Sequence, residues 1–154
     1  MASVFETPQF EAFVKYGALS LAKMLNMSLL TGVVRMAKGS FANKEDYTSS
    51  GRLSPDELKA KLATPDPFLE RIRRCHLNDM ENIPPFILTG LFFVLAANPT
   101  LDSCNWHFRI FLASRILHSI CYILALPQPS RLLCFTVGFV TTCSMLLRAI
   151  AAVW

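Results

Sequence analysis

Charged residues are scarce in this sequence. They make up 17% of its 154 residues, whereas about a quarter is usual for a soluble domain, and apolar residues make up 53%. This composition excludes an intrinsically disordered chain. The net charge is only +4 and basic residues are mixed with acidic ones, which disfavours a nucleic-acid-binding surface. A mean hydropathy of +0.39 indicates that a lipid bilayer solvates most of the apolar side chains.

The sequence also lacks a C-x-x-C motif and the basic start of a signal peptide. Its five cysteines have no paired C-x-x-C spacing that would hold zinc or form a redox disulfide, so we interpret them as reduced, buried side chains and expect no metal site. Residues 1–10 contain Glu6 but no Lys or Arg, which disfavours a cleaved signal peptide. We therefore expect the first apolar segment to remain in the protein.

Long uncharged runs predict membrane-spanning helices, because about twenty helical residues cross the ~30 Å hydrocarbon layer. The expected helices lie at about residues 10–38, 70–98, 106–126 and 130–152, within a single domain of residues 1–154. The fold class is therefore all-α. The first segment is the weakest candidate taken alone, because Lys15 and Lys23 interrupt it. Lys23 lies too deep to reach an interface, so it needs a partner that the sequence does not identify.

The connection at residues 40–69 is polar. Within it, the run S-P-D-E at residues 54–57 predicts an N-cap, a first-turn proline and a capping-box glutamate, which open a short helix ending near Ala63. Nine of the fifteen basic residues lie within residues 35–74, in or beside this connection. This bias assigns the connection to the cytoplasmic side and both termini to the opposite side of the membrane.

Polar side chains at membrane depth form two stripes. The second expected helix carries four polar residues, spaced three or four positions apart on one face: Arg71, Arg74, Asn78 and Glu81. The third expected helix carries three with the same spacing: Arg115, His118 and Tyr122. Ionisable groups in a spanning segment cost on the order of 2.5 to 3.5 kcal/mol each, so they face partners or a wet cavity.

Two interpretations of these stripes remain open. The side chains can hold the helices together, with Glu81 paired to Arg115, Asn78 bridging two backbones and His118 a fully bonded bundle histidine. Alternatively, the surplus of arginine over carboxylate leaves guanidinium groups free to grip an anionic ligand. Arg131 adds to this surplus at the start of the fourth helix, beside the unpaired N–H groups of the first turn.

The segment carrying the first stripe resembles a known signature. Residues 70–81 read E-R-I-R-R-C-H-L-N-D-M-E. This run is similar to the E-R-x-x-R-x-H-x-N-D-x-E motif of the membrane-associated proteins in eicosanoid and glutathione metabolism, the MAPEG family. Residues 41–46 (F-A-N-K-E-D) and 107–131 resemble two further segments of that family, and the whole resemblance covers about residues 10–145. It is closest to the branch of microsomal glutathione transferases, followed by the prostaglandin E synthases.

The resemblance implies a left-handed four-helix bundle that assembles as a homotrimer in the membrane. It also implies that glutathione binds as co-substrate at the subunit boundaries, near the cytoplasmic face. The residues that it places in the site of one subunit are Arg74, Asn78, Glu81, His118, Tyr122 and Arg131. The resemblance also implies that Arg35 reaches the site from the neighbouring subunit. The alternative is that Arg35 only sets the orientation of the first helix in the membrane. We also assign Arg71 and Arg115 to glutathione binding, because they belong to the same stripes.

The implied activity is glutathione transfer to hydrophobic electrophiles from the bilayer, with glutathione-dependent peroxidase activity on lipid hydroperoxides. Arg131 is the expected catalytic residue, because a guanidinium beside sulfur favours the reactive thiolate over the thiol. Two alternatives are a glutathione-dependent prostaglandin E synthase and a non-catalytic membrane scaffold or lipid-binding protein. The expected location is the endoplasmic reticulum membrane or the mitochondrial outer membrane.

Three departures from the family pattern qualify this expectation. Tyr47 stands where some transferases of this branch carry a cysteine at which thiol reagents activate them, so that regulation is not expected here. Lys44 replaces a proline, which is a minor change in the loop. Leu132 and Phe135 stand in place of a serine and a tyrosine of the prostaglandin synthase, which disfavours prostaglandin isomerisation.

Overall fold

The computed structural model describes residues 4–48 and 53–154. These residues form helices and loops and no β-strand, which confirms the predicted all-α class. The chain has four long helices: α1 (Pro8–Lys38), α4 (Pro67–Ala96), α5 (Leu101–Ile123) and α6 (Ser130–Ala151). The shorter elements are the 3-10 helix η1 (Val4–Glu6) and the helices α2 (Lys44–Thr48) and α3 (Pro55–Ala63).

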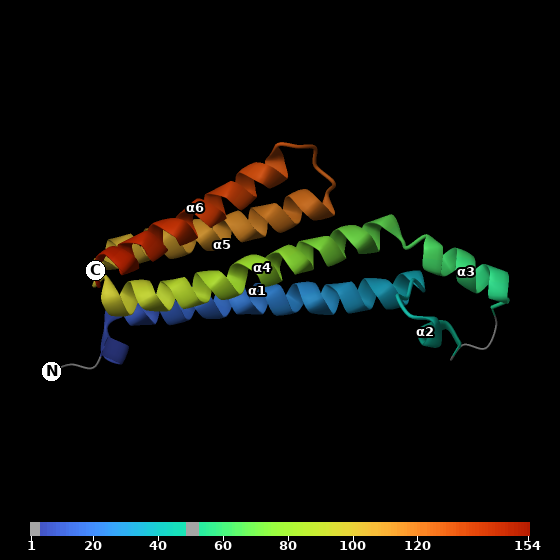
Figure 1. Cartoon of the computed structure of the whole chain (residues 1–154), viewed down its shortest axis with the longest axis horizontal. Helices are drawn as coiled ribbons and strands as arrows, with labels where there is room; N and C mark the ends of the chain where they lie inside the picture. Colours follow the sequence, from blue (N-terminus) through green and yellow to red (C-terminus); the bar gives the residue numbers. More distant parts are fainter. Residues whose placement is uncertain (1–3, 49–52) are drawn as a thin grey trace.

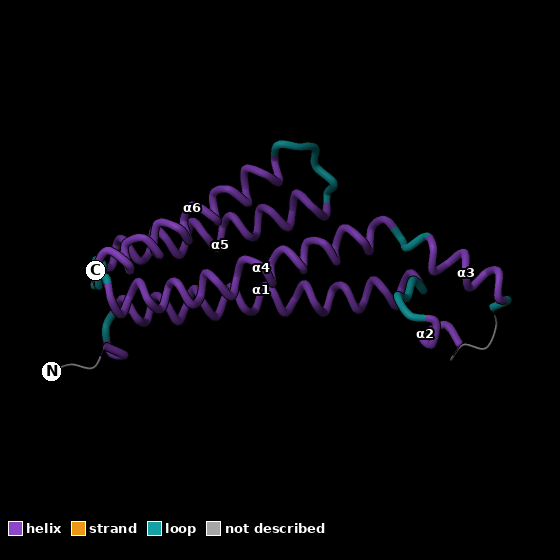
Figure 2. Tube along the Cα trace, in the orientation of Figure 1, coloured by secondary structure: helices purple, strands orange, loops and turns teal. Residues whose placement is uncertain are grey.

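The four long helices lie side by side (Figure 1). Helix α1 packs against α4 and α5, and α6 packs against the same two helices. The start of α1 and the end of α6 lie at one end of the molecule, whereas α2 and α3 lie at the other (Figure 1). The hairpin of α5 and α6 leans away from α4 toward its turn, as the tube in Figure 2 makes plain. At this splayed end the start of α6 lies beside the end of α5, where Arg131 lies over the ring of Tyr122.

Side-chain caps fix where the helices begin. At Ser54 the predicted capping box is confirmed, because its side chain accepts from the Glu57 N–H while Glu57 bonds back to the Ser54 N–H. Asp66 accepts from the N–H groups of the first turn of α4, at 2.9 and 3.0 Å. Thr100 caps α5 in the same way. Because of these two caps, α4 and α5 begin several residues before the expected positions 70 and 106.

Aromatic side chains fill the core among the long helices. The rings of Phe86 and Phe111 stack with centroids 3.7 Å apart, and Phe108 meets Phe86 edge-on at 5.9 Å. A Cβ at Gly90 would lie 3.2 Å from the ring of Phe13, which is tighter than most Cβ contacts, so a larger residue would press this ring away from α4. The core therefore ties α1, α4 and α5 together near the end where α1 starts.

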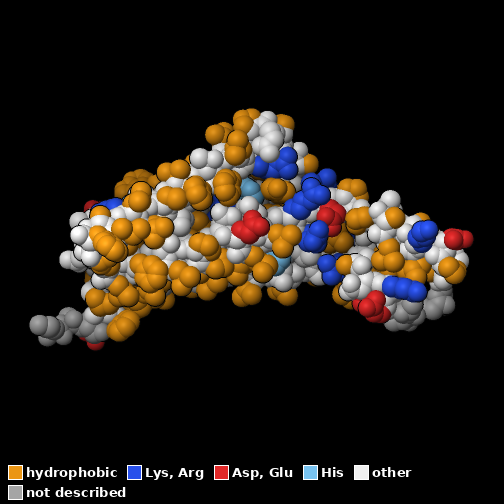
Figure 3. Space-filling model, in the orientation of Figure 1, with side chains coloured by type: hydrophobic (Ala, Val, Ile, Leu, Met, Phe, Trp, Pro, Cys, Tyr) orange, Lys and Arg blue, Asp and Glu red, His pale blue; other side chains and the backbone are white. Residues whose placement is uncertain are grey.

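Three of the described helices, α1, α4 and α6, are long and apolar enough to cross a membrane. Hydrophobic side chains dominate the face of the long helices in Figure 3. The expectation that the first segment is the weakest candidate is wrong, because α1 is among the three. Helix α5 has 23 residues but is not among them, since Asp102, Arg109 and Arg115 lower its hydropathy.

Candidate functional site

The stripe on α4 is divided between half-buried and exposed side chains. Arg71 and Asn78 are half-buried, whereas Arg74 and Glu81 are exposed. The guanidinium of Arg71 lies 5.7 Å from the ring centroid of Phe68, and its Nε is enclosed with no hydrogen-bond partner in the described part of the chain. The guanidinium of Arg74 lies 3.9 Å from the carboxylate of Glu70. Both arginines thus keep donors that no acid among residues 4–48 and 53–154 uses.

Arg115 lies between α4 and α6 and has no exposed surface. Its Nη1 donates to the side-chain oxygen of Asn78 at 2.9 Å, and its Nη2 donates to the backbone carbonyl of Cys134 at 3.1 Å. The alternative pairing of Arg115 with Glu81 is therefore wrong, and among the residues described Glu81 takes part in no ion pair. Asn78 joins two helices through its side chain, not through two backbones.

The second stripe continues into the start of α6. His118 is only 3% exposed, and its ring centroid lies 5.0 Å from that of Tyr122. The Arg131 guanidinium lies over the other ring of this pair, 4.8 Å from the Tyr122 centroid. Over residues 4–48 and 53–154, neither His118 Nδ1 nor Arg131 Nε has a hydrogen-bond partner, although both atoms are enclosed. The interpretation in which the stripes only hold the helices together expected a fully bonded His118, and this histidine is not fully bonded.

Arg35 lies apart from this group, near the end of α1. It lines a cavity of about 320 Å³ together with Phe41, Glu70 and Arg73. Its Nε is also enclosed without a partner among the described residues. A second cavity, of about 290 Å³, opens between α4 and α6 beside Glu81, where the rings of Phe135 and Phe139 stack. Of the predicted site residues, Arg35 thus lines the first of these cavities and Glu81 lines the second.

Basic side chains gather over this half, between the α5–α6 turn and the region of α2 and α3 (Figure 3). Their excess over acids gives the region a positive field, which attracts anions. Of the arginines predicted to bind, Arg35, Arg71, Arg115 and Arg131 each keep an enclosed Nε that no described residue bonds. Such guanidinium groups can grip carboxylates through paired N–H donors. The described residues include no cluster of three or more His, Cys, Asp or Glu side chains that could hold a metal ion.

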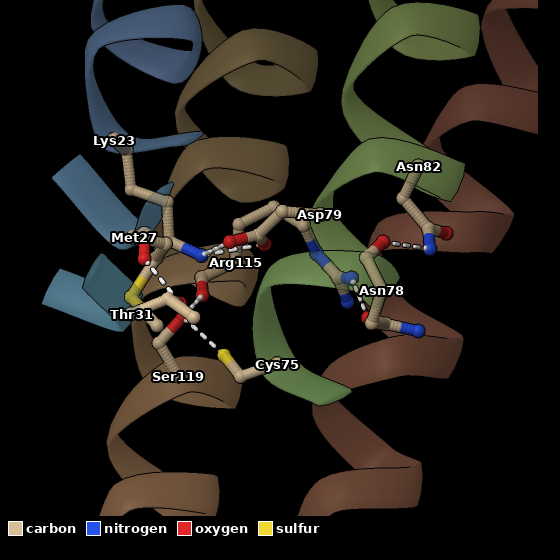
Figure 4. Close-up of polar contacts among 9 residues, drawn as sticks. All are labelled: Lys23, Met27, Thr31, Cys75, Asn78, Asp79, Asn82, Arg115 and Ser119. Carbon is tan, nitrogen blue, oxygen red and sulfur yellow. Dashed lines mark hydrogen bonds and ion pairs between the residues drawn. The ribbon is translucent and has the colours of Figure 1, made fainter. Parts of the chain in front are cut away.

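One buried pair was not identified from the sequence. Lys23 on α1 donates to the carboxylate of Asp79 on α4, and Asp79 has no exposed surface (Figure 4). Asp79 lies on the buried face of α4 with Ile72 and Cys75, and not on the polar stripe of this helix. The signal that could have found it is the need of Lys23 for a carboxylate, since Asp79 is the acid of α4 on that face.

The cysteines carry no disulfide, as predicted. All five are free, and Cys75, Cys104 and Cys121 are buried. The thiol of Cys75 donates to the hydroxyl of Ser119 at 3.2 Å, which ties α4 to α5 (Figure 4). The other two, Cys134 and Cys143, are only half-buried, so the expectation of burial holds for three of the five.

A model of the MAPEG family matches residues 13–151. The chain belongs to the MAPEG family. Microsomal glutathione S-transferase 1 of Homo sapiens is 40% identical over 148 residues, which cover 96% of this MAPEG chain and 93% of the relative. The protein of the same name from Rattus norvegicus is 44% identical over 137 residues, covering 89% and 86%. Prostaglandin E synthase of Homo sapiens is 35% identical over 147 residues, covering 94% and 90%.

Proposed function

We propose that this chain is a membrane-bound glutathione transferase that conjugates glutathione to hydrophobic electrophiles and also reduces lipid hydroperoxides. Its similarity to microsomal glutathione S-transferase 1 over 96% of its length supports this activity. The observation that carries the proposal is the position of Arg131. This guanidinium lies in the first turn of α6, over the Tyr122 ring, with an enclosed Nε that no described residue bonds.

Arg131 favours the reactive form of glutathione. A free thiol has a pKa of about 8.5, so at neutral pH it is mostly protonated, and only the thiolate is a good nucleophile. The guanidinium charge and the N-terminus of α6 both stabilise an anion at this point. Each unit by which they lower the pKa of the glutathione thiol corresponds to about 1.4 kcal/mol.

The thiolate then reacts in one of two ways. With an electrophile, sulfur bonds to the electrophilic carbon and any leaving group departs as an anion. With a hydroperoxide, sulfur bonds to the terminal oxygen, the O–O bond breaks, and the remaining alkoxide takes up a proton to become an alcohol. A second glutathione displaces water from the resulting sulfenic acid and yields glutathione disulfide. Neither reaction requires a metal.

The remaining site residues bind the rest of glutathione. Arginine pairs well with carboxylates, of which glutathione has two, and we assign these contacts to Arg71 and Arg74. Glu81 accepts from the α-amine. The polar groups assigned to the amides are Asn78, His118 and Tyr122. The cavity of about 290 Å³ beside Glu81, Phe135 and Phe139 offers the hydrophobic substrate a place next to this group.

The proposed assembly is a homotrimer of four-helix membrane bundles, in which α5 also spans the bilayer. In this assembly Arg35 completes the glutathione site of a neighbouring subunit, which agrees with its position near the end of α1 and with its enclosed, unbonded Nε. The burial of Arg115 inside the bundle lets α5 cross the membrane without exposing that charge to lipid. The connection at residues 40–69 faces the cytosol, and the membrane is that of the endoplasmic reticulum or the mitochondrial outer membrane.

The purified protein tests this proposal with two substrates in the presence of glutathione. We expect turnover of chlorodinitrobenzene to exceed isomerisation of a prostaglandin endoperoxide. Arg131→Ala should abolish conjugation while helicity is unchanged, whereas Arg148→Ala, at the far end of α6, should retain it. Isomerase activity alone would favour a prostaglandin E synthase, to which relatives 35% identical lend support. Absence of both activities and of glutathione binding would favour a scaffold or lipid-binding protein.

A further inference from the structure

Arg115 fixes the orientation of a neighbouring amide. A guanidinium has only N–H donors, so the group of Asn78 that faces Nη1 at 2.9 Å must be the carbonyl oxygen. The amide nitrogen of Asn78 then points away from Arg115, as Figure 4 shows. The backbone carbonyl of Asn78 is also engaged, since it accepts from the Asn82 side chain at 2.7 Å. Asn78 therefore offers a donor, and not an acceptor, on its half-buried outer side.

A glycine on α6 makes room for this guanidinium. A Cβ at Gly138 would lie 2.7 Å from Ser114 Oγ, 3.2 Å from Arg115 Nε and 3.3 Å from Arg115 Nη2. The first of these distances is shorter than real Cβ contacts, so any other residue would move Ser114 and press on Arg115. The Cys134 carbonyl, one turn before Gly138, holds the other end of the guanidinium at 3.1 Å. Helix α6 thus provides both a slot and an acceptor for Arg115.

We propose that Arg115 is a positioning residue that does not touch glutathione. It holds the Asn78 amide so that the Nδ2 hydrogens donate to an acceptor oxygen of glutathione, and Gly138 is the residue that permits this. The inference rests on the proposed function, because it takes Asn78 to contact glutathione. It replaces the expectation that Arg115 itself binds the ligand, since its side chain has no exposed surface.

Gly138→Ala tests the slot with the smallest possible change. We expect the Kd for glutathione, measured by calorimetry on the purified full chain, to rise about tenfold, the equivalent of one hydrogen bond to a ligand. Gly17→Ala in α1 is the matched control, because a Cβ there has nothing within 4 Å. The control should bind glutathione within about twofold of the unmodified protein, as expected for a change outside the Arg115 slot. An unchanged Kd in Gly138→Ala would overturn the inference.

A double-mutant cycle separates positioning from a general effect on the fold. If Arg115 acts through Asn78, then Asn78→Ala and the double variant Asn78→Ala/Gly138→Ala should have the same Kd, because the donor is already absent. Two losses that multiply would instead place the effect of Gly138 elsewhere and overturn the proposal. In both outcomes the unmodified chain binds glutathione. If it does not, the proposed function fails first.

Asn78→Asp keeps the proposal testable if Gly138→Ala does not fold. The aspartate still accepts from Arg115, so the thermal unfolding midpoint should stay at or above that of the unmodified chain. It has no N–H to offer glutathione, so the Kd should rise by at least tenfold. Binding as tight as that of the unmodified chain would contradict the assignment of Asn78 as a donor.

Discussion

The buried ion pair between Lys23 and Asp79 leads to a quantitative prediction about stability. The carboxylate has no exposed surface and the Lys23 side chain is 13% exposed, so removing the lysine leaves an uncompensated buried charge. Breaking such a pair by removing one partner costs about 3–5 kcal/mol, whereas replacing both by apolar residues is close to neutral. Lys23→Met should therefore destabilise the protein strongly, and Lys23→Met/Asp79→Leu should largely restore it.

Thermal unfolding in detergent, followed by circular dichroism, measures this difference. At 2–4 °C per kcal/mol for a chain of about this size, the single variant should lower the midpoint by roughly 6–20 °C. Arg73→Met is the matched control. It removes the partner of Glu70 in a pair whose arginine is 47% exposed, and exposed pairs contribute less than about 1 kcal/mol. If the single and double variants of the buried pair melted at the same temperature, the pairing would be refuted.

Three further predictions concern packing and capping. Gly90→Val should destabilise the protein by about 1–3 kcal/mol by overpacking the ring of Phe13, measured as a lower unfolding midpoint, whereas Gly17→Ala, whose Cβ would have nothing within 4 Å, should not show this loss. Phe86→Ala should cost about 3–5 kcal/mol in the same assay, because it empties a fully buried, stacked position. The pKa of Asp66 lies below its usual 3.8, because its carboxylate accepts from the backbone N–H of the third helical residue. Its stabilising effect is therefore complete above the unfolded-state pKa and is lost as the pH falls through the folded-state pKa, so the midpoint of Asp66→Asn should fall less on acidification.

The local features of the fold were predictable because neighbouring residues determine them. The capping box at Ser54 and the proline that follows it set the start of α3, and long apolar runs locate the four long helices. The stripe residues could be found from their spacing, since a helix brings positions three and four apart to one face. These inferences need no knowledge of how the helices are arranged.

The pairings between helices were not predictable in the same way. Charge alone suggests Glu81 as the partner of Arg115, but the rotation of α4 and α5 about their axes presents Asn78 instead. The partner of Lys23 lies 56 residues away, on the buried face of α4 and not on the stripe. Both results depend on helix packing, which is fixed by the aromatic core and by the close approach at Gly138.

Helix packing also explains how α5 can carry a charged residue at membrane depth. Arg115 lowers the apolar character of this helix, yet the side chain is completely enclosed by α4 and α6. The hydropathy of a single helix counts the charge of Arg115, but it does not include the hydrogen-bond acceptors that α4 and α6 provide for this charge. The prediction of four spanning helices came from long uncharged runs, and three of the described helices have the length and composition of a membrane span.

The most direct test of the central claim is a titration of bound glutathione, in which thiolate absorbance is followed against pH. The account predicts that the unmodified protein forms the thiolate at least one pH unit below free glutathione, whose pKa is about 8.5. In Arg131→Ala the midpoint should return to that of the free thiol. A bound thiol that titrates like free glutathione in the unmodified protein, or a midpoint that Arg131→Ala leaves in place, would contradict the account.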